Sequence, residues 1–215
     1  MQPIGRSERF RQASRWQEAT NHPFVRELVA GTLSRERFAR YVIQDYLFVG
    51  TLVDAVAYLV AKAPGMDRKR RFVQFLQVLT GAEDAFFRET FDALGIPPAA
   101  WGEAKPEPLT ECFCDFLLRA TGLGGYAEGL AVLLPVEWIY LDWALAAGRS
   151  YPEFMPYRRW IELHATPEFE AFVEGMRADF DALDVRPEEE DHLRRLFQRV
   201  VEFEIEFWTL AYGTP

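Results

Sequence analysis

Four acidic residues occupy positions where an amphipathic helix normally carries an apolar side chain. They are Asp45, Glu83, Glu137 and Glu204, and each lies within a stripe of apolar residues that recur at steps of three and four. This spacing puts each acid at the centre of the buried face of its helix. Burying an unpaired carboxylate costs several kcal/mol, so each group needs a partner, a proton or a ligand. We therefore predict a shared polar pocket, built from four helices.

The residue types around these acids favour acid/base chemistry on a flat ring. Three residues after each acid stand Phe48, Phe86, Tyr140 and Phe207. Aromatic rings can stack on a planar heterocycle. Two carboxylates in unequal surroundings can hold opposite protonation states near neutral pH. For each acid taken singly, the alternative is a buried structural residue paired with a tyrosine, tryptophan or arginine.

Metal, haem and thiol chemistry fit the pattern less well. A carboxylate-bridged di-metal site in a bundle uses Glu-x-x-His, and aromatic residues stand at the histidine positions here. An all-carboxylate Mg²⁺ or Mn²⁺ site stays open as an alternative. Haem commonly takes an axial histidine, but His22 precedes a proline in a turn and His192 is expected at a solvated helix start. Cys112 and Cys114 are expected to be small core residues, not nucleophiles. We predict no metal and no cofactor.

The elements that position these groups are predicted to be helices, because period-two alternation between turn signals is absent. Ser34 is expected to cap a long helix. Pro135 lies inside a strong helical pattern and is expected to bend the helix beside Glu137, opening space for a small molecule. The stretch 101–108 reads as a loop. The expected helices are 6–20, a short one from 23, 34–63, 67–94, 109–121, 125–147, 152–164, 167–183 and 187–212.

Composition bounds the remaining possibilities. The 215 residues, 49% of them hydrophobic, suffice for one full-sized core, and no linker or repeat divides them, so we predict a single domain over 1–215. A net charge of −9 argues against nucleic acid or an anionic membrane as the main partner. We find no apolar run of membrane-spanning length and no secretory signal. Two cysteines fit a reducing cytosol, so a cytoplasmic location is expected.

Three separated segments resemble the TenA family, also called thiaminase II. They are residues 44–49 (QDYLFV), 135–140 (PVEWIY) and 204–208 (EIEFW), with an HPF sequence at 22–24 upstream of the first. The resemblance extends over about residues 8–212. It implies an all-α, haem-oxygenase-like fold that binds no haem, and a homodimer or homotetramer.

One position departs from the commoner family pattern. Most bacterial members carry a catalytic cysteine directly after the proline, and this chain has Val136 there. The chain instead resembles the E subclass, which lacks that cysteine and has the neighbouring acid, here Glu137. That subclass implies thiamin salvage: removal of an N-formyl group, then hydrolysis of aminomethylpyrimidine to hydroxymethylpyrimidine plus ammonia. Phe48 and His164 stand where the cysteine-bearing members often have tyrosine, so the polar contacts of the pocket differ.

The residues and the resemblance together suggest a role for each group. Asp45 is expected to bind the ring nitrogen and 4-amino group of the pyrimidine, and Glu204 to protonate the departing amine. Glu137 is expected to activate water, helped by the Tyr140 hydroxyl. Further substrate contacts are expected from Phe48 and Trp138 at the ring, from His164, and from Glu83, which orients another member of the group.

Two rival functions remain on the sequence alone. The first is a non-catalytic pyrimidine-binding or regulatory protein of the same fold, which ammonia release would distinguish from the enzyme. The second is a haem-oxygenase-like oxidase, which needs a metal or quinone site that metal analysis would detect.

Overall fold

The computed structural model describes residues 4–148 and 151–213, and all its regular elements are helices, which confirms the all-α class. The α-helices are α1 (Arg6–Gln12), α2 (Trp16–Thr20), α3 (Pro23–Ala30), α4 (Arg35–Lys62), α5 (Met66–Val78), α6 (Asp84–Ala93), α7 (Pro98–Gly102), α8 (Pro108–Leu118), α9 (Tyr126–Ala146), α10 (Met155–Leu163), α11 (Pro167–Asp181) and α12 (Pro187–Tyr212). Two π-helical turns, η1 (Leu79–Glu83) and η2 (Arg119–Leu123), follow α5 and α8.

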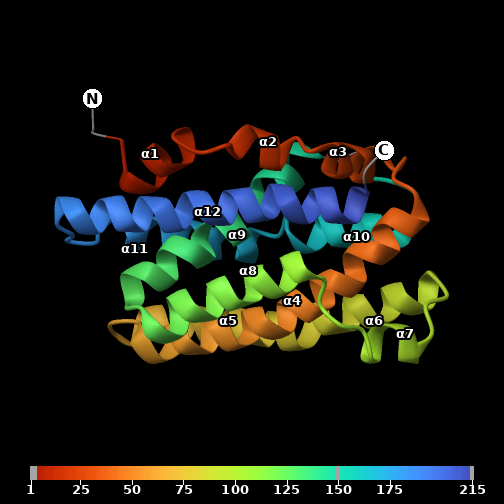
Figure 1. Ribbon diagram of the computed structural model, residues 1–215, viewed down its shortest axis with the longest axis horizontal. Helices are drawn as coiled ribbons and strands as arrows, with labels where there is room; N and C mark the ends of the chain where they lie inside the picture. Colours follow the sequence, from red (N-terminus) through yellow and green to blue (C-terminus); the bar gives the residue numbers. More distant parts are fainter. Residues whose placement is uncertain (1–3, 149–150, 214–215) are drawn as a thin grey trace.

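Helix α9 forms the centre of the bundle. It packs against α12, α11 and α4, and every residue from 129 to 141 is buried. A helix that is apolar on all sides is expected in the interior. At Gly129 an added Cβ would lie 2.5 Å from the Leu59 side chain, so glycine permits the close approach of α4 to α9. In Figure 1, α12 runs the length of the molecule, with α1–α3 along one side and α4, α5 and α8 on the other.

Several helix starts have the expected chemistry. The Ser34 hydroxyl accepts a hydrogen bond from the Arg37 backbone N–H at 3.3 Å, which confirms the predicted cap of α4. The His22 ring accepts one from the Phe24 N–H at 3.2 Å, so this histidine caps α3, which begins at residue 23 as predicted. Helix α12 has the predicted bounds. Pro135 lies inside α9, which continues through it.

The first predicted helix is divided in two. Residues 13–15 separate α1 from α2, because the Ser14 hydroxyl and N–H both bond to the Arg11 carbonyl, at 2.8 and 3.2 Å. Serine side chains compete with helical hydrogen bonds in this way. The Ala13 carbonyl accepts instead from the Gln198 amide of α12 at 2.7 Å. The break thus fixes the N-terminal segment to α12.

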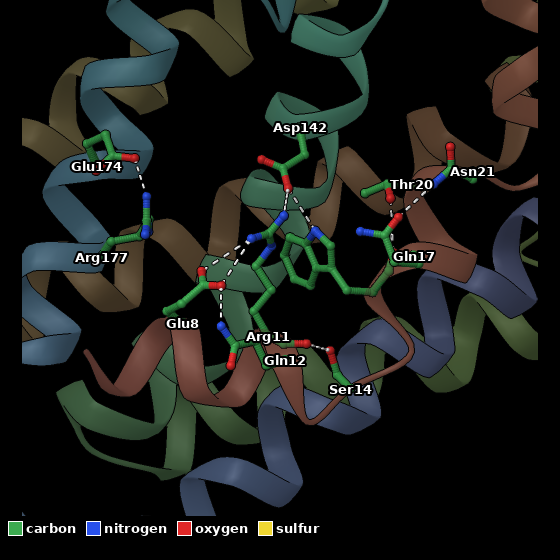
Figure 2. A network of polar contacts seen from close by, with 11 residues as sticks. Glu8, Arg11, Gln12, Ser14, Gln17, Thr20, Asn21, Asp142, Glu174 and Arg177 are labelled. Atoms are coloured by element: carbon green, nitrogen blue, oxygen red, sulfur yellow. Dashed lines mark hydrogen bonds and ion pairs between the residues drawn. The ribbon is translucent and has the colours of Figure 1, made fainter. Parts of the chain in front are cut away.

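Figure 2 shows a second attachment of the N-terminal segment, centred on Asp142 of α9. One carboxylate oxygen accepts from the Arg11 guanidinium at 3.1 Å and from the Trp16 indole N–H at 2.8 Å. Glu8 pairs with the same arginine at 3.2 Å. These contacts hold α1 and α2 against the outer side of α9, while the other side of α9 faces the remaining helices.

Other boundaries differ in ways that matter for the site. The helix predicted over 67–94 contains the π-helical turn η1, which ends at Glu83. Such turns are rare and frequently mark functional sites. Residues 98–102 form α7, which reaches into the start of the loop predicted over 101–108, and α10 begins at Met155 instead of the predicted 152.

Cys112 corrects a prediction, because it is exposed, and Cys114 is only partly buried. Successive residues of a helix point in different directions. On α8 the core position between them belongs to Phe113, which is 1% exposed.

Two helices, α4 and α9, are long and apolar enough to span a membrane by length and composition. The sequence prediction that no run reached this length was therefore wrong. Burial explains the apolarity, since 83% of the most apolar window of α9 and 50% of that of α4 lie inside the protein. Both act as core helices here.

Candidate active site

A small cavity lies where α4, η1 and α9 meet the end of α10. Three of the predicted acids line it: Asp45 from α4, Glu83 from η1 and Glu137 from α9. Its volume is about 20 Å³, enough for about one water molecule. The other residues that line the cavity are Phe48, Val49, Leu52, Val136, Tyr140, Trp160 and His164.

Glu204 is buried but does not line this cavity, although we predicted that it would face the same space. Its side chain on α12 is 2% exposed, and its charge interacts with Asp45, Glu137 and Tyr140. A cavity the size of one water molecule is bounded only by the nearest groups. Glu204 therefore belongs to the acid cluster without reaching the wall.

Burial determines the protonation of this acid cluster, by which we mean Asp45, Glu83, Glu137 and Glu204. Desolvation raises the pKa of Asp45 to about 7, an effect that the neighbouring Tyr41 hydroxyl partly opposes. Desolvation and then the charge of Asp45 raise the pKa of Glu83 to about 8. For Glu137 and Glu204, burial and the neighbouring acids raise the pKa well above the ordinary range. The cluster therefore holds several protons at neutral pH and titrates as a coupled set.

Two carboxyl oxygens in the cluster lack a hydrogen-bond partner among the described residues. Asp45 Oδ2 and Glu137 Oε1 are buried and make no hydrogen bond with the described residues. Buried polar atoms rarely lack a hydrogen-bond partner, and each atom that does so calls for an explanation. Both residues line the cavity, so a polar ligand placed there would satisfy them. Within residues 4–148 and 151–213, the acids of the cluster take part in no ion pair.

A metal ion is not favoured at this site. Across the described part of the chain, no group of three or more histidine, cysteine, aspartate or glutamate side chains has an arrangement suited to a metal ion. Three of the four acids face a space bounded by aromatic rings, and Glu204 lies behind them. Their arrangement suits proton transfer and hydrogen bonding to an organic molecule.

Two further polar groups complete the cavity wall. The Tyr140 hydroxyl lies 2.9 Å from the hydroxyl of Tyr41. His164 Nδ1 lies 2.9 Å from the Trp160 carbonyl oxygen, which can only accept, so Nδ1 carries the proton and Nε2 is left as an acceptor. Burial lowers the pKa of His164 to about 4, which keeps the ring neutral.

Trp138 does not join this group, despite its predicted contact with the substrate ring. Its indole packs 4.9 Å from the ring of Trp16 and lies under the Arg177 guanidinium at 4.1 Å. Neighbouring residues on a helix point about 100° apart, so Glu137 and Trp138 cannot face the same way. Trp138 attaches α9 to the outer helices.

Sequence reasoning missed Tyr41 as a member of the site. It lies one helical turn before Asp45 on the same apolar stripe of α4, and it is fully buried. A tyrosine within such a stripe reads as core, and only the contact with Tyr140 shows its polar role.

The fold and the acid-lined centre define the class of protein. The structure superposes with a TM-score of 0.71 on a domain from Shewanella denitrificans OS217 described as having a heme oxygenase-like fold, at 15% identity over 94% of this chain and 88% of that one. It superposes with a TM-score of 0.87 on a TenA homologue from P. horikoshii OT3, at 26% identity over 97% of this chain and 99% of that one. The chain therefore has the haem-oxygenase-like fold.

Within that class, the TENA/THI-4/PQQC family model matches residues 11–214, and the chain belongs to this family. It is 29% identical to the aminopyrimidine aminohydrolase of Bacillus subtilis (strain 168), over 92% of this chain and 84% of that protein. It is also 29% identical to the aminopyrimidine aminohydrolase of Helicobacter pylori, over 92% of this chain and 93% of that protein.

Proposed function

We propose that this protein is a thiamin-salvage hydrolase that acts on aminopyrimidine fragments, removing an N-formyl group and converting aminomethylpyrimidine to hydroxymethylpyrimidine plus ammonia. The observation that carries the proposal is the pair of buried, unpartnered carboxyl oxygens of Asp45 and Glu137 in one aromatic-walled cavity. The names of the two bacterial relatives point to the same substrate class.

Asp45 binds the pyrimidine in this scheme. An aminopyrimidine presents a ring nitrogen beside an exocyclic amino group, a pair that matches the two oxygens of a carboxyl group when one proton lies between the ring nitrogen and the carboxyl group. With a pKa of about 7, Asp45 is available both as carboxylate and as acid near neutral pH. The ring of Phe48 bounds the pyrimidine on the cavity wall, and Glu83 orients the carboxyl group of Asp45, with which its charge interacts.

The hydrolytic step needs one proton donor and one acceptor. The bond from the methylene carbon to the amine nitrogen breaks, and a bond from that carbon to the water oxygen forms. Glu204, whose raised pKa keeps it protonated, gives its proton to the departing nitrogen. Glu137 takes a proton from the attacking water, beside the Tyr140 hydroxyl. The charges of Glu137 and Glu204 interact, so the proton can return between turnovers.

Glu137 must be ionised to act as a base, and the bound substrate supplies the positive charge that favours the ionised form. A pyrimidine ring that carries a proton on the nitrogen facing Asp45 is positively charged, and this charge lowers the pKa of Glu137, offsetting the effect of burial, while the aminomethyl nitrogen stays neutral and accepts the proton of Glu204. The reaction therefore proceeds without a cofactor and without a covalent nucleophile. Val136 lines the cavity beside Glu137 at the place where other family members carry cysteine, which fits the E subclass.

The cavity must enlarge to admit a pyrimidine, since about 20 Å³ is far less than a ring requires. Enlargement would also bring Glu204 into contact with the substrate. We further propose that the protein works in the cytoplasm as a homodimer or homotetramer, as the family resemblance implies.

Ammonia release tests the function directly. The purified protein is supplied with aminomethylpyrimidine, its N-formyl derivative and thiamin, and ammonia and formate are measured by coupled assays. We expect ammonia from the first substrate, formate from the second and little cleavage of the third. Glu137→Gln, which removes the proposed base, serves as the inactive control. Tight pyrimidine binding without product from any substrate would favour the non-catalytic alternative.

A further inference from the structure

We propose that Tyr41 is a positioning residue that couples the pyrimidine-binding carboxyl group of Asp45 to the hydroxyl of Tyr140 across the cavity. The inference rests on the proposed function in one respect, since it assigns the two ends of the coupling to the ring-binding and water-activating sides of the site.

The contacts of Tyr41 connect two helices. Its hydroxyl oxygen lies 2.9 Å from that of Tyr140 on α9. On α4, Tyr41 and Asp45 are four residues apart and so share one face of the helix. Burial raises the pKa of both groups; beyond that, the Tyr41 hydroxyl lowers the pKa of Asp45 and the Asp45 carboxyl group raises that of Tyr41, as expected of two groups that lie close together. Tyr41 thus stands between an acid and a hydroxyl that both line the cavity, although Tyr41 itself does not.

The ring of Tyr41 is held on all sides. It is 0% exposed, and its centroid lies 4.9 Å from that of Phe24, 5.4 Å from Trp208 and 5.9 Å from Phe207. These rings come from α3 and α12, so elements far apart in sequence fix the hydroxyl in place. A hydroxyl that cannot move can still rotate its hydrogen between two acceptors.

The number of hydroxyl hydrogens limits how Asp45, Tyr41 and Tyr140 can hydrogen-bond to one another. Each tyrosine hydroxyl has one hydrogen to donate. When Asp45 is ionised, Tyr41 donates to it and must accept from Tyr140, whose lone pairs are then free to accept from the cavity. When Asp45 is protonated, Tyr41 is free to donate to Tyr140, which then presents its hydrogen to the cavity. The protonation of Asp45 therefore sets whether Tyr140 accepts or donates.

This switch suits the proposed reaction. A pyrimidine whose ring nitrogen carries a proton, held on ionised Asp45, finds Tyr140 as an acceptor, ready for the N–H of the aminomethyl group or the O–H of the attacking water. The other titratable groups that face the pair are Glu83 on η1, Glu137 on α9, His164 after α10 and Glu204 on α12.

The test compares two tyrosine-to-phenylalanine variants. Tyr41→Phe keeps the packed ring and removes the hydroxyl. Tyr157→Phe is the matched control, because Tyr157 is also buried and donates one hydrogen bond, to the Leu33 carbonyl at 2.8 Å, outside the site. We expect kcat for ammonia release to fall about 10- to 100-fold in Tyr41→Phe, with KM changing much less, as for a misplaced catalytic group. Tyr157→Phe should keep the parent kcat.

Two further measurements separate positioning from a merely structural role. In ¹³C-labelled protein the Asp45 carboxyl resonance, identified by its loss in Asp45→Asn, should titrate at higher pH in Tyr41→Phe, because the hydroxyl stabilises the carboxylate. The double variant Tyr41→Phe/Tyr140→Phe should be no slower than Tyr140→Phe alone, since residues that act as a unit are not additive.

The outcomes are distinct for the two proposals. An unchanged Asp45 titration, or a kcat loss in Tyr41→Phe no larger than that in Tyr157→Phe, overturns the coupling. A parent protein that releases no ammonia overturns the proposed function instead, and the carboxyl titration then decides the coupling alone.

Discussion

Two buried acidic sites in this protein have opposite surroundings. Asp179 on α11 is buried, and both its oxygens are engaged: Arg68 donates at 2.8 Å, Arg71 at 2.5 Å and the Tyr126 hydroxyl at 3.1 Å. The acid cluster at the centre has four carboxyl groups, and the ion pairs of the described residues leave all four out.

The difference divides acids with a structural role from the acids that we propose to be functional. Asp179 joins α11 to α5 and to the start of α9, and its charge is balanced by cations that remain partly exposed. An acid of this kind has no oxygen without a hydrogen-bond partner that a ligand could satisfy. The cluster carries unsatisfied oxygens and raised pKa values, a combination that is common at active sites and costly elsewhere. The following predictions test this division.

The largest effect is expected at Glu204. Glu204→Gln keeps the shape of the side chain but removes the proton donor, so kcat should fall about 100- to 10,000-fold while pyrimidine binding persists. The matched control is Glu206→Gln on the same helix, since Glu206 pairs with Arg199 at 3.2 Å near the surface. Steady-state ammonia release and calorimetric binding provide the comparison. Parent-like turnover in Glu204→Gln would remove it from the mechanism.

Asp179→Asn should show the reverse pattern. It leaves two guanidinium groups without their carboxylate, so the free energy of unfolding should fall by about 1–3 kcal/mol. Turnover of the folded variant should equal that of the parent. Urea denaturation and the ammonia assay measure the two quantities. A selective loss of kcat at full stability would place Asp179 on the functional side of the division.

The cluster should also make stability depend on pH. The pKa of Asp45 is about 7 in the folded protein against an ordinary value of 3.8, so between these values the folded state binds a proton that the unfolded chain has lost. Stability is therefore greatest at low pH within this window and falls as pH rises through it, by up to about 1.4 kcal/mol per pH unit for one such group.

Asp45→Asn should flatten this dependence and leave the variant more stable than the parent at the upper end of the window. Urea denaturation at several pH values from 3.8 to about 7 measures the slope. Asp179→Asn, which changes an acid that is paired with arginines, is the control variant for this slope. An unchanged slope in Asp45→Asn would mean that Asp45 is ionised throughout.

The smallest effect is expected from Val136→Cys, which should not confer strong thiamin cleavage. The position is 3% exposed, and burial raises the pKa of a thiol, as does an ionised Glu137 beside it. Thiamin cleavage by parent and variant at neutral pH is the comparison. Robust cleavage by the variant would show a pocket already built for the cysteine mechanism, and the E-subclass assignment would have to be given up.

The sequence predicted the burial of the acids, because that signal is periodic. Asp45, Glu83 and Glu137 interrupt apolar stripes, and a helical period alone places such residues in the core. Periodicity shows which face of a helix is buried, but not how far a side chain on that face lies from the cavity. It therefore could not show that Glu204 lies behind the cavity wall. It also says little about neighbours, and Trp138 was included although it points away from Glu137 on the same helix.

Other features depend on contacts that no local pattern encodes. The break between α1 and α2 depends on the Ser14 hydroxyl and on Gln198, which is far away in the sequence. The role of Tyr41 depends on a tyrosine from another helix. The π-helical turn before α6 left no signature in the apolar spacing, because Glu83 fits an ordinary helical stripe equally well.

The size of the central cavity has a kinetic consequence. A space of about 20 Å³ offers an approaching ring no preformed shape, so the side chains that line it must move apart before a pyrimidine can be seated. Association is then limited by the frequency of that opening and should lie well below the diffusion limit. The product, nearly the same size as the substrate, must wait for the same motion, so opening and closing of the pocket would set the ceiling on turnover.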